Sequence, residues 1–272
     1  MLFRSNDFAP NGALAVKRSI AVGVGLLCWL LAAAGPVAAQ VLTVSAAASL
    51  GPALREIGAA FERSNRPLRV QLNVAGSNAL LAQIARGAPV DVFASADAET
   101  MDRAAAQRLL LAASRRDIAR NSLVLVLPAS AAAAAPGRLV DLAQVARAPQ
   151  VRRIAIGNPT TVPAGRYAKT ALEHEGLWTA VQDRLVFADD VRQVLAYVER
   201  GEVDAGFVYR TDALSAGPRI GRVIALPGAP PVQYPIAAIA AAAQPKAALD
   251  FIGFVAGPAG RAILARHGFE PP

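Results

Sequence analysis

The stretch VLTVSAAASL, residues 41–50, indicates the fold, because an apolar segment runs through small residues into a serine. Val41 to Ser45 has the apolar, β-branched character of a buried strand. From Ser49 to Arg63, apolar residues recur at the spacing of one helical face, which predicts a helix. A strand that turns directly into a helix is the repeating unit of α/β proteins.

The alternation continues along the chain. It predicts strands at 68–74, 90–94, 122–127, 154–156, 205–208 and 232–240, and helices at 77–86, 98–110, 164–175, 190–200, 246–255 and 258–267. This order predicts an α/β fold in which mainly parallel sheets carry helices on both faces. The alanine run 131–135 is predicted to be a loop or a poorly ordered helix, and the Pro- and Gly-rich segment 218–231 a connection.

No Gly/Ser linker divides the chain, which favours two similar lobes joined by chain crossings. We expect crossings near 120–121 and near 226–234. The first lobe would then contain residues 40–120 plus 232–272, and the second lobe residues 121–231.

The first 39 residues have the layout of a cleaved secretory signal. Basic residues precede an uncharged apolar run, 19–34, and small residues follow at 37–39. A membrane anchor is the alternative, but the run is short for a membrane span. We therefore expect export to the periplasm and a mature chain that begins near Gln40.

Composition narrows the function. The single cysteine, Cys28, lies in the predicted signal, so the mature chain would have no disulfide and no thiol chemistry. Three of the 28 basic residues and one of the 20 acidic residues also lie there, so the net charge falls from +8 to +6. The remaining charges are interspersed, which indicates a solvated surface and no nucleic-acid partner.

Several strand-to-helix turns have features of an anion site. Ser49 and Ser77 follow small residues and open helices; a serine there is first of all an N-cap, but small neighbours leave backbone N–H groups accessible to an anion. The turns at 159–165 and 189–191 also enter helices, the second with Asp190 as a predicted cap. Tyr209 ends a predicted strand, at the edge where open parallel sheets bind ligands.

Taken together, these segments resemble the periplasmic molybdate-binding proteins of ABC importers, which have the type II periplasmic-binding-protein fold. The resemblance covers nearly the whole predicted mature chain. It rests on VSAAASL (44–50), GAPVDVFASAD (87–97), NSLVLVLP (121–128), GNPTTVPAGRYAKTAL (157–172), DDVRQVLAYVERGEVDAGFVY (189–209) and GPAGRAILARHGF (257–269).

The resemblance implies that the chain binds molybdate, and tungstate as well, between its lobes and delivers it to a membrane permease with a cytoplasmic ATPase. By position in the motifs, it implies hydroxyl donors at Ser49, Ser77 and Tyr209 and backbone N–H donors at Ala164 and Val191. It also implies a monomer with no cofactor, no catalytic residue and no direct cation ligand.

One turn departs from the family pattern. The chain has Gly76-Ser77-Asn78 where relatives often have a run of serines, so we expect a side-chain donor beside the pocket to be lost or replaced by Asn78.

The implied donors fit the chemistry of the ligand. A fully deprotonated tetrahedral dianion offers only acceptors, so a matched site supplies only donors. Phosphate at neutral pH still carries a proton and needs an acceptor, which favours molybdate, tungstate or sulfate. Sulfate therefore stays open as the alternative ligand.

Other classes of protein fit less well. The mature chain has two histidines, neither at zinc-binding spacing, and no nucleophile elbow, P-loop or dinucleotide motif, so we do not expect an enzyme. An anion-sensing module of a transcription regulator would carry a helix-turn-helix and no secretory signal. An iron-binding importer component would need clustered tyrosines or histidines, and the four tyrosines are scattered.

Overall fold

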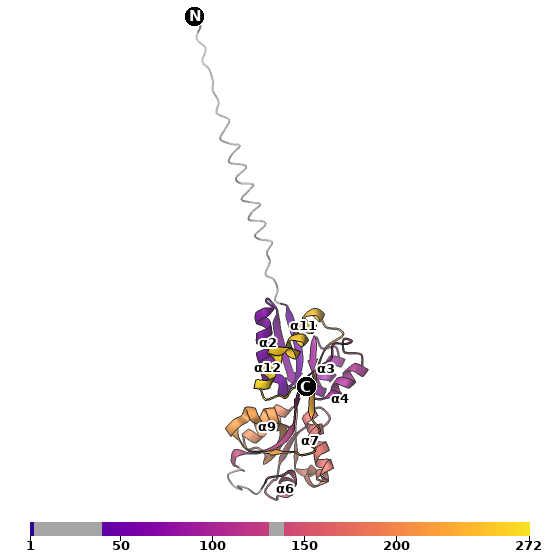
Figure 1. Cartoon of the computed structure of the whole chain (residues 1–272), viewed down its shortest axis with the longest axis vertical. Coiled ribbons are helices and arrows are strands. Elements are labelled where there is room, and N and C mark those ends of the chain that lie inside the picture. The colour runs from indigo at the N-terminus through magenta and orange to yellow at the C-terminus, as the bar shows by residue number, and fades with distance from the viewer. Residues whose placement is uncertain (3–39, 131–138) are drawn as a thin grey trace. The chain divides into compact units, whose positions relative to one another are not determined.

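The computed structural model describes residues 1–2, 40–130 and 139–272, and Gln40–Pro272 forms one compact unit (Figure 1). The predicted secretory signal and the alanine run 131–135 lie outside the described residues. Within the described residues, no single helix has both the length and the hydropathy of a membrane span, and the one pair that reaches them together is bent by 58°.

The first of two five-stranded sheets has the strand order β2-β1-β3-β10-β4. Its strands are β1 (Val41–Ala47), β2 (Arg69–Ala75), β3 (Val92–Ala94), β4 (Arg116–Asn121) and β10 (Val232–Ala238). Strand β10 is antiparallel to both of its neighbours, while β1 pairs in parallel with β2 and β3.

Helices cover both faces of the first sheet. One face packs on α2 (Gly51–Ser64) and α11 (Pro245–Ala256), with α12 (Pro258–Arg266) beside them, and the 3-10 turn η1 (Ala48–Leu50) precedes α2. The other face packs on α3 (Ser77–Ala85) and α4 (Ala98–Ala106). Phe93 and Ala237 point to this second face, where they join a cluster with Leu80, Leu81 and Met101.

The second sheet has the order β7-β6-β8-β5-β9. It contains β5 (Leu123–Pro128), β6 (Ile154–Gly157), β7 (Leu185–Ala188), β8 (Ala205–Tyr209) and β9 (Ile220–Ala225). Around it lie α6 (Leu142–Arg147), α7 (Pro163–His174), α8 (Trp178–Val181), α9 (Val191–Glu199) and α10 (Arg210–Ala216), with 3-10 turns η2 (Gln182–Arg184) and η3 (Gly217–Arg219). Strand β5 is antiparallel to β8 and β9.

We call each sheet with its helices a lobe; Figure 1 shows α2, α3, α4, α11 and α12 around the first sheet and α6, α7 and α9 around the second. The chain passes from β4 to β5 through Ser122 and returns from β9 to β10 through residues 226–231. In each sheet, the antiparallel strand is the first strand made after a crossing. The predicted two-lobed α/β fold is confirmed, and each sheet is mixed.

Three strands escaped the sequence prediction: β4, β7 and β9. Each lies at an edge of its sheet. In β9, for example, Ile220 and Ile224 are buried while Gly221 and Val223 are exposed, so the apolar run is interrupted. The prediction of a connection over 218–231 was therefore wrong for residues 220–225. Helix α4 also ends at Ala106 and not near 110, and Arg108 follows with a positive φ of 56°.

Local features place the turns that face the space between the lobes. Pro163 occupies the first turn of α7, where a missing N–H costs nothing. Gly165, the third residue of the helix, allows α7 to pack closely on β6, because a Cβ at Gly165 would lie 1.9 Å from the carbonyl oxygen of Gly157. Asp190 caps α9 by accepting from the N–H groups of Arg192 at 2.8 Å and Gln193 at 3.0 Å, as predicted.

Candidate ligand-binding site

A small pocket with about 190 Å³ of empty space lies where turns of the two lobes meet. Every lining residue is small, hydroxylic or apolar except Asp190, whose Oδ1 accepts both hydrogen bonds of the α9 cap. Among the described residues, no Lys or Arg lines the pocket. It consists of Ala47, Ala48, Ser49, Ala75, Gly76, Ser77 and Ala96 from the first lobe and Val162, Pro163, Asp190, Val191 and Tyr209 from the second.

Four of the five predicted site residues line this pocket: Ser49, Ser77, Val191 and Tyr209. Ala164 is fully buried as the second residue of α7, directly after the lining residue Pro163. The structure therefore brings four of the five together and places the fifth next to them in the chain.

The hydroxyl of Ser77 has a fixed polarity. Its Oγ accepts from the backbone N–H of Ala96 at 3.1 Å, so its own proton is left to donate. Ser77 is the first residue of α3, and the N-cap position is occupied by Gly76. Neither Ser77 nor Ser49 caps a helix through its side chain, so the ordinary capping role does not account for them.

The hydroxyl of Tyr209 is a buried donor without a partner. Tyr209 is 1% exposed, and among the described residues no hydrogen-bond partner reaches its oxygen. Burial raises the pKa of the Tyr209 phenol well above its ordinary value, so the group keeps its proton. An unsatisfied buried hydroxyl is costly in a folded protein, and an acceptor in the pocket would remove that cost.

Three helices begin at the pocket: α3, α7 and α9. Because Pro163 has no N–H, Ala164 supplies the first N–H of α7. In α9, the cap takes the N–H groups of Arg192 and Gln193, so the N–H of Val191 is not used by it. Helix N-termini favour an anion through free N–H groups and the helix dipole.

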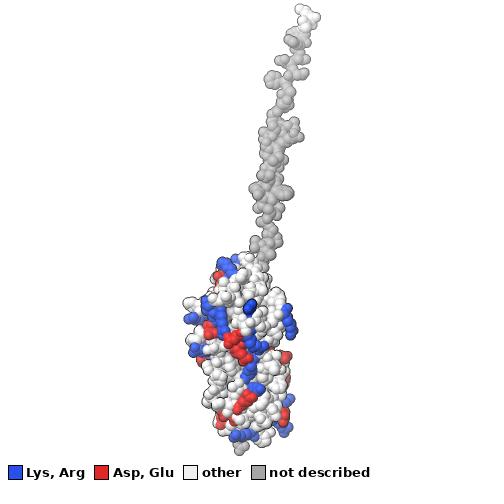
Figure 2. Space-filling view, turned by 90° about the vertical axis from the view of Figure 1, so that its right-hand side faces the viewer, with Lys and Arg blue, Asp and Glu red and all other residues white. Residues whose placement is uncertain are grey.

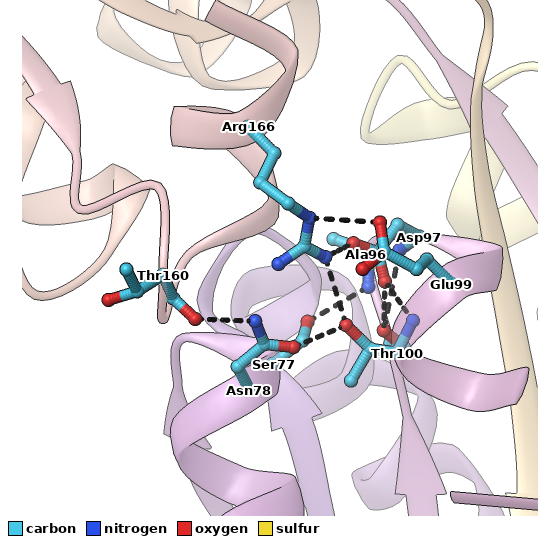
Figure 3. Close-up of polar contacts among 9 residues, drawn as sticks. Ser77, Asn78, Ala96, Asp97, Glu99, Thr100, Thr160 and Arg166 are labelled. Atoms are coloured by element: carbon cyan, nitrogen blue, oxygen red, sulfur yellow. Dashed lines mark hydrogen bonds and ion pairs between the residues drawn. The ribbon is translucent and has the colours of Figure 1, made fainter. Parts of the chain in front are cut away.

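The two lobes touch beside the pocket. Asn78 donates from its backbone N–H to the Thr161 carbonyl at 3.2 Å and from Nδ2 to the Thr160 carbonyl at 2.7 Å. Its Oδ1 accepts from the Thr100 hydroxyl at 2.6 Å (Figure 3). The amide is committed to these contacts, so of the two expectations for this turn, replacement of the donor by Asn78 does not fit, while loss of the donor stays a prediction. Asn78 joins the lobes instead.

Sequence reasoning missed a second contact between the lobes. Arg166 of α7 points at the start of α4, where it forms an ion pair with Asp97 and donates to the Thr100 hydroxyl at 3.1 Å (Figure 3). Its Nε lies 3.4 Å from a carboxylate oxygen of Glu99. The sequence did contain a sign of this contact, because Arg166 directly follows VPAG (162–165) in the motif 157–172.

Behind Tyr209, a buried carboxylate supports the pocket wall. Asp212 is fully buried, accepts from the Tyr209 N–H at 3.2 Å and lies 3.2 Å from Nε of Arg192. Burial raises the pKa of Asp212 to about 6, with Arg192 acting in the opposite direction.

A larger recess, with about 900 Å³ of empty space, lies on the second lobe. Its lining comes from residues 141–143, 170–175 and 225–230 and includes none of the predicted site residues. The small pocket has the inward-facing donors and the helix N-termini, so we place the site there.

Neither metal-ligating side chains nor surface charge indicates a different site. Among the described residues, no group of three or more His, Cys, Asp or Glu side chains is placed to hold a metal ion. Figure 2 shows one face of the molecule, on which basic and acidic side chains are mixed over both lobes.

The family model described as "Bacterial extracellular solute-binding protein" matches residues 42–270. The chain belongs to this family. It is 36% identical to the molybdate-binding protein ModA of Escherichia coli K12, over 84% of this chain and 88% of the relative. The family is one of solute-binding proteins, and the pocket between the lobes is the candidate binding site.

Two solved structures share the fold of this chain. The periplasmic molybdate-binding protein of Azotobacter vinelandii superposes with a TM-score of 0.76 at 28% identity, covering 85% of this chain and 99% of that one. The sulfate-binding protein SubI of Mycobacterium tuberculosis gives a TM-score of 0.73 at 18% identity, covering 85% and 87%. The second likeness concerns the fold alone, and the expected periplasmic-binding-protein architecture is confirmed.

Proposed function

We propose that this chain binds molybdate, and tungstate in the same manner, between its two lobes and delivers the anion to an ABC importer. The anion would accept from the hydroxyls of Ser49, Ser77 and Tyr209 and from the backbone N–H groups of Ala164 and Val191. The relatives named for molybdate, at up to 36% identity over most of the chain, support this choice of oxyanion.

The hydroxyl of Tyr209, which has no hydrogen-bond partner within the described part of the chain, is the observation that carries the proposal. A protonated, buried phenol at the pocket wall needs an acceptor, and Ser77 in the same pocket accepts from Ala96 and has its own proton left to donate. A fully deprotonated tetrahedral dianion supplies acceptors in every direction. Because no Lys or Arg of the described ranges lines the pocket, hydrogen bonds and helix N-termini would balance the charge.

The proposal extends to the cell. A secretory signal over residues 1–39 would send the chain to the periplasm, where a monomer would carry the anion to a permease with a cytoplasmic ATPase. The lobes would divide into residues 40–120 with 232–272 and residues 121–231, and close around the anion by a hinge at the two crossings. This role needs no cofactor, since the anion is cargo.

A thermal-shift titration of residues 40–272 tests the ligand. Molybdate, tungstate, sulfate and phosphate are compared, since a ligand at about 1,000 times its Kd stabilises the folded state by about 4 kcal/mol. We expect large shifts with molybdate and tungstate only. A shift with sulfate alone would replace the proposed cargo by the alternative one, and no shift with any of them would refute oxyanion binding.

Two variants test the residues. Ser49→Ala and Ser77→Ala should each weaken molybdate binding by about 1–3 kcal/mol, because an oxygen of the dianion loses its donor in a dry pocket. Ser215→Ala, at a serine whose hydroxyl bonds the Asp212 carbonyl away from the pocket, is the control. If both pocket variants bind like the parent, the site is placed wrongly.

A further inference from the structure

Tyr234, which was not predicted as a site residue, lies between the pocket and β4, the strand that leads into the first crossing. Its hydroxyl is 3.2 Å from Oγ of Ser49 and 3.3 Å from Nδ2 of Asn121. Tyr234 is fully buried on β10, and Asn121 ends β4 just before the first crossing. Asn121 is 2% exposed and Ser49 is 3% exposed, so the three polar groups form a dry chain.

The direction of this chain is set at its far end. Oδ1 of Asn121 accepts from the backbone N–H of Ser122 at 2.9 Å. Nδ2 is therefore the end of the amide that meets the Thr211 hydroxyl, at 2.9 Å, and the Tyr234 hydroxyl. An amide nitrogen only donates, so the oxygen of Tyr234 is the acceptor of this bond.

Of the two polar atoms in contact with the Tyr234 hydroxyl, only Oγ of Ser49 can then accept its proton. Asn121 cannot receive it, and a buried hydroxyl that donates to nothing costs free energy. Burial raises the pKa of Tyr234, so the proton is kept. Once Ser49 accepts from Tyr234, its own proton has to point elsewhere, and the pocket is where Ser49 lies.

We propose that Tyr234 is a positioning residue that fixes Ser49 as a donor, through a relay from Asn121 to Tyr234 to Ser49 to the bound anion. The inference rests on the proposed function and deepens it. Under this proposal, the preference for fully deprotonated tetrahedral dianions depends on the hydrogen-bonded chain of Asn121, Tyr234 and Ser49, and not on Ser49 alone. Ser77 has its direction set by a backbone N–H, whereas Ser49 depends on a replaceable side chain.

A double-mutant cycle tests the relay. Tyr234→Phe keeps the ring and removes the hydroxyl, and it should weaken molybdate binding about tenfold, the size of one hydrogen bond. In a Ser49→Ala background the same change should alter the Kd less than about twofold, because the group through which Tyr234 acts is gone. Affinities are measured by calorimetry on residues 40–272, and Tyr197→Phe, whose hydroxyl accepts from Gln193 at 2.8 Å, is the matched control.

Selectivity provides the second readout. Without Tyr234, the Ser49 hydroxyl is free to turn its oxygen toward the pocket and accept a proton. The Kd for phosphate divided by the Kd for molybdate, both measured at pH 7, should therefore be smaller in Tyr234→Phe than in the parent. In Tyr197→Phe this ratio should stay unchanged. A variant that lost only packing would weaken both anions alike.

Asn121→Asp tests the polarity without deleting a group. A carboxylate would draw the Tyr234 proton toward itself, so Tyr234 would accept from Ser49 and the pocket would lose a donor. Asn121→Asp should therefore reduce molybdate affinity more in the parent than in the Ser49→Ala background. If the new charge acted only by repelling the anion, the loss of affinity would be equal in both backgrounds. Equal losses for both Asn121→Asp and Tyr234→Phe in the two backgrounds would overturn the relay. Absence of oxyanion binding in the parent would overturn the proposed function itself.

Discussion

Arg166 of the second lobe forms an ion pair with Asp97 of the first lobe, and the same Asp97 caps helix α4 by accepting from the Thr100 N–H at 2.9 Å. The Asp97 side chain is 5% exposed and the Arg166 side chain 22% exposed, so the pair is shielded from solvent. One carboxylate thus anchors a helix start and a lobe contact together. We infer that this pair holds the lobes closed over the neighbouring pocket.

Removing the arginine should speed the release of the ligand. Arg166→Gln is expected to raise the dissociation rate of molybdate about tenfold, because a shielded charge pair across the lobes is lost while the pocket donors stay. Stopped-flow dissociation measures it. Lys169→Gln is the control, since Lys169 lies on the same helix and its contacts, Glu173 and the ring of Trp178, belong to the same lobe. Equal rates in the two variants would mean that the pair does not hold the lobes.

Gly76 allows the lobes to approach. A Cβ there would lie 2.8 Å from the Thr161 carbonyl oxygen and 3.0 Å from that of Asp189, both in the second lobe. Gly76→Ala should weaken molybdate binding by about 1–3 kcal/mol, the usual cost of overpacking, with little change in melting temperature without ligand. Gly253→Ala in α11, where a Cβ meets nothing within 4 Å, is the control. Unchanged affinity would show that the ligand-bound lobes are further apart here.

Tyr209→Phe should separate binding from stability. The hydroxyl has no partner among the described residues, so its removal should leave the free energy of unfolding without ligand unchanged or raise it by up to about 1 kcal/mol. Molybdate affinity should fall by about 1.5–3 kcal/mol, the range of a hydrogen bond to a charged group. Denaturant melts and calorimetry measure the two quantities. A marked loss of stability would contradict the account of a donor reserved for the ligand.

Asp212 should make stability depend on pH. Its pKa is about 6 in the folded protein against an ordinary 3.8, so the folded state holds the proton more tightly than the unfolded state. The cost of ionising it is absent below about pH 4 and complete above about pH 6, and it amounts to on the order of 3 kcal/mol.

The comparison with Asp212→Asn isolates this effect. Asparagine imitates the protonated carboxyl, so the two proteins should be similarly stable at pH 4, and the variant should be the more stable at pH 7. Urea melts at several pH values measure the difference. If the free energy of unfolding of the parent instead rose relative to that of the variant with increasing pH, the contact with Arg192 would outweigh the effect of burial.

The sequence allowed the lobes and the pocket turns to be predicted because their signals are local. Apolar runs marked the central strands, and small residues before Ser49 and Ser77 marked accessible helix starts. The edge strands β4 and β9 were missed since polar residues interrupt their apolar runs, whereas β7 is apolar but only four residues long. Tyr234 and Arg166 were missed as well, because their roles depend on partners distant in sequence.

Strand β10 has a consequence for how the chain folds. It lies between β3 and β4, and its Ile236 pairs with Ala94. Until β10 is synthesised, the first sheet is divided into β2-β1-β3 and an isolated β4, although the whole second lobe has already been made. This arrangement gives the first lobe a high contact order and slow closure. For a chain that we propose crosses a membrane before folding, the delay keeps the amino-terminal lobe open during synthesis and transport.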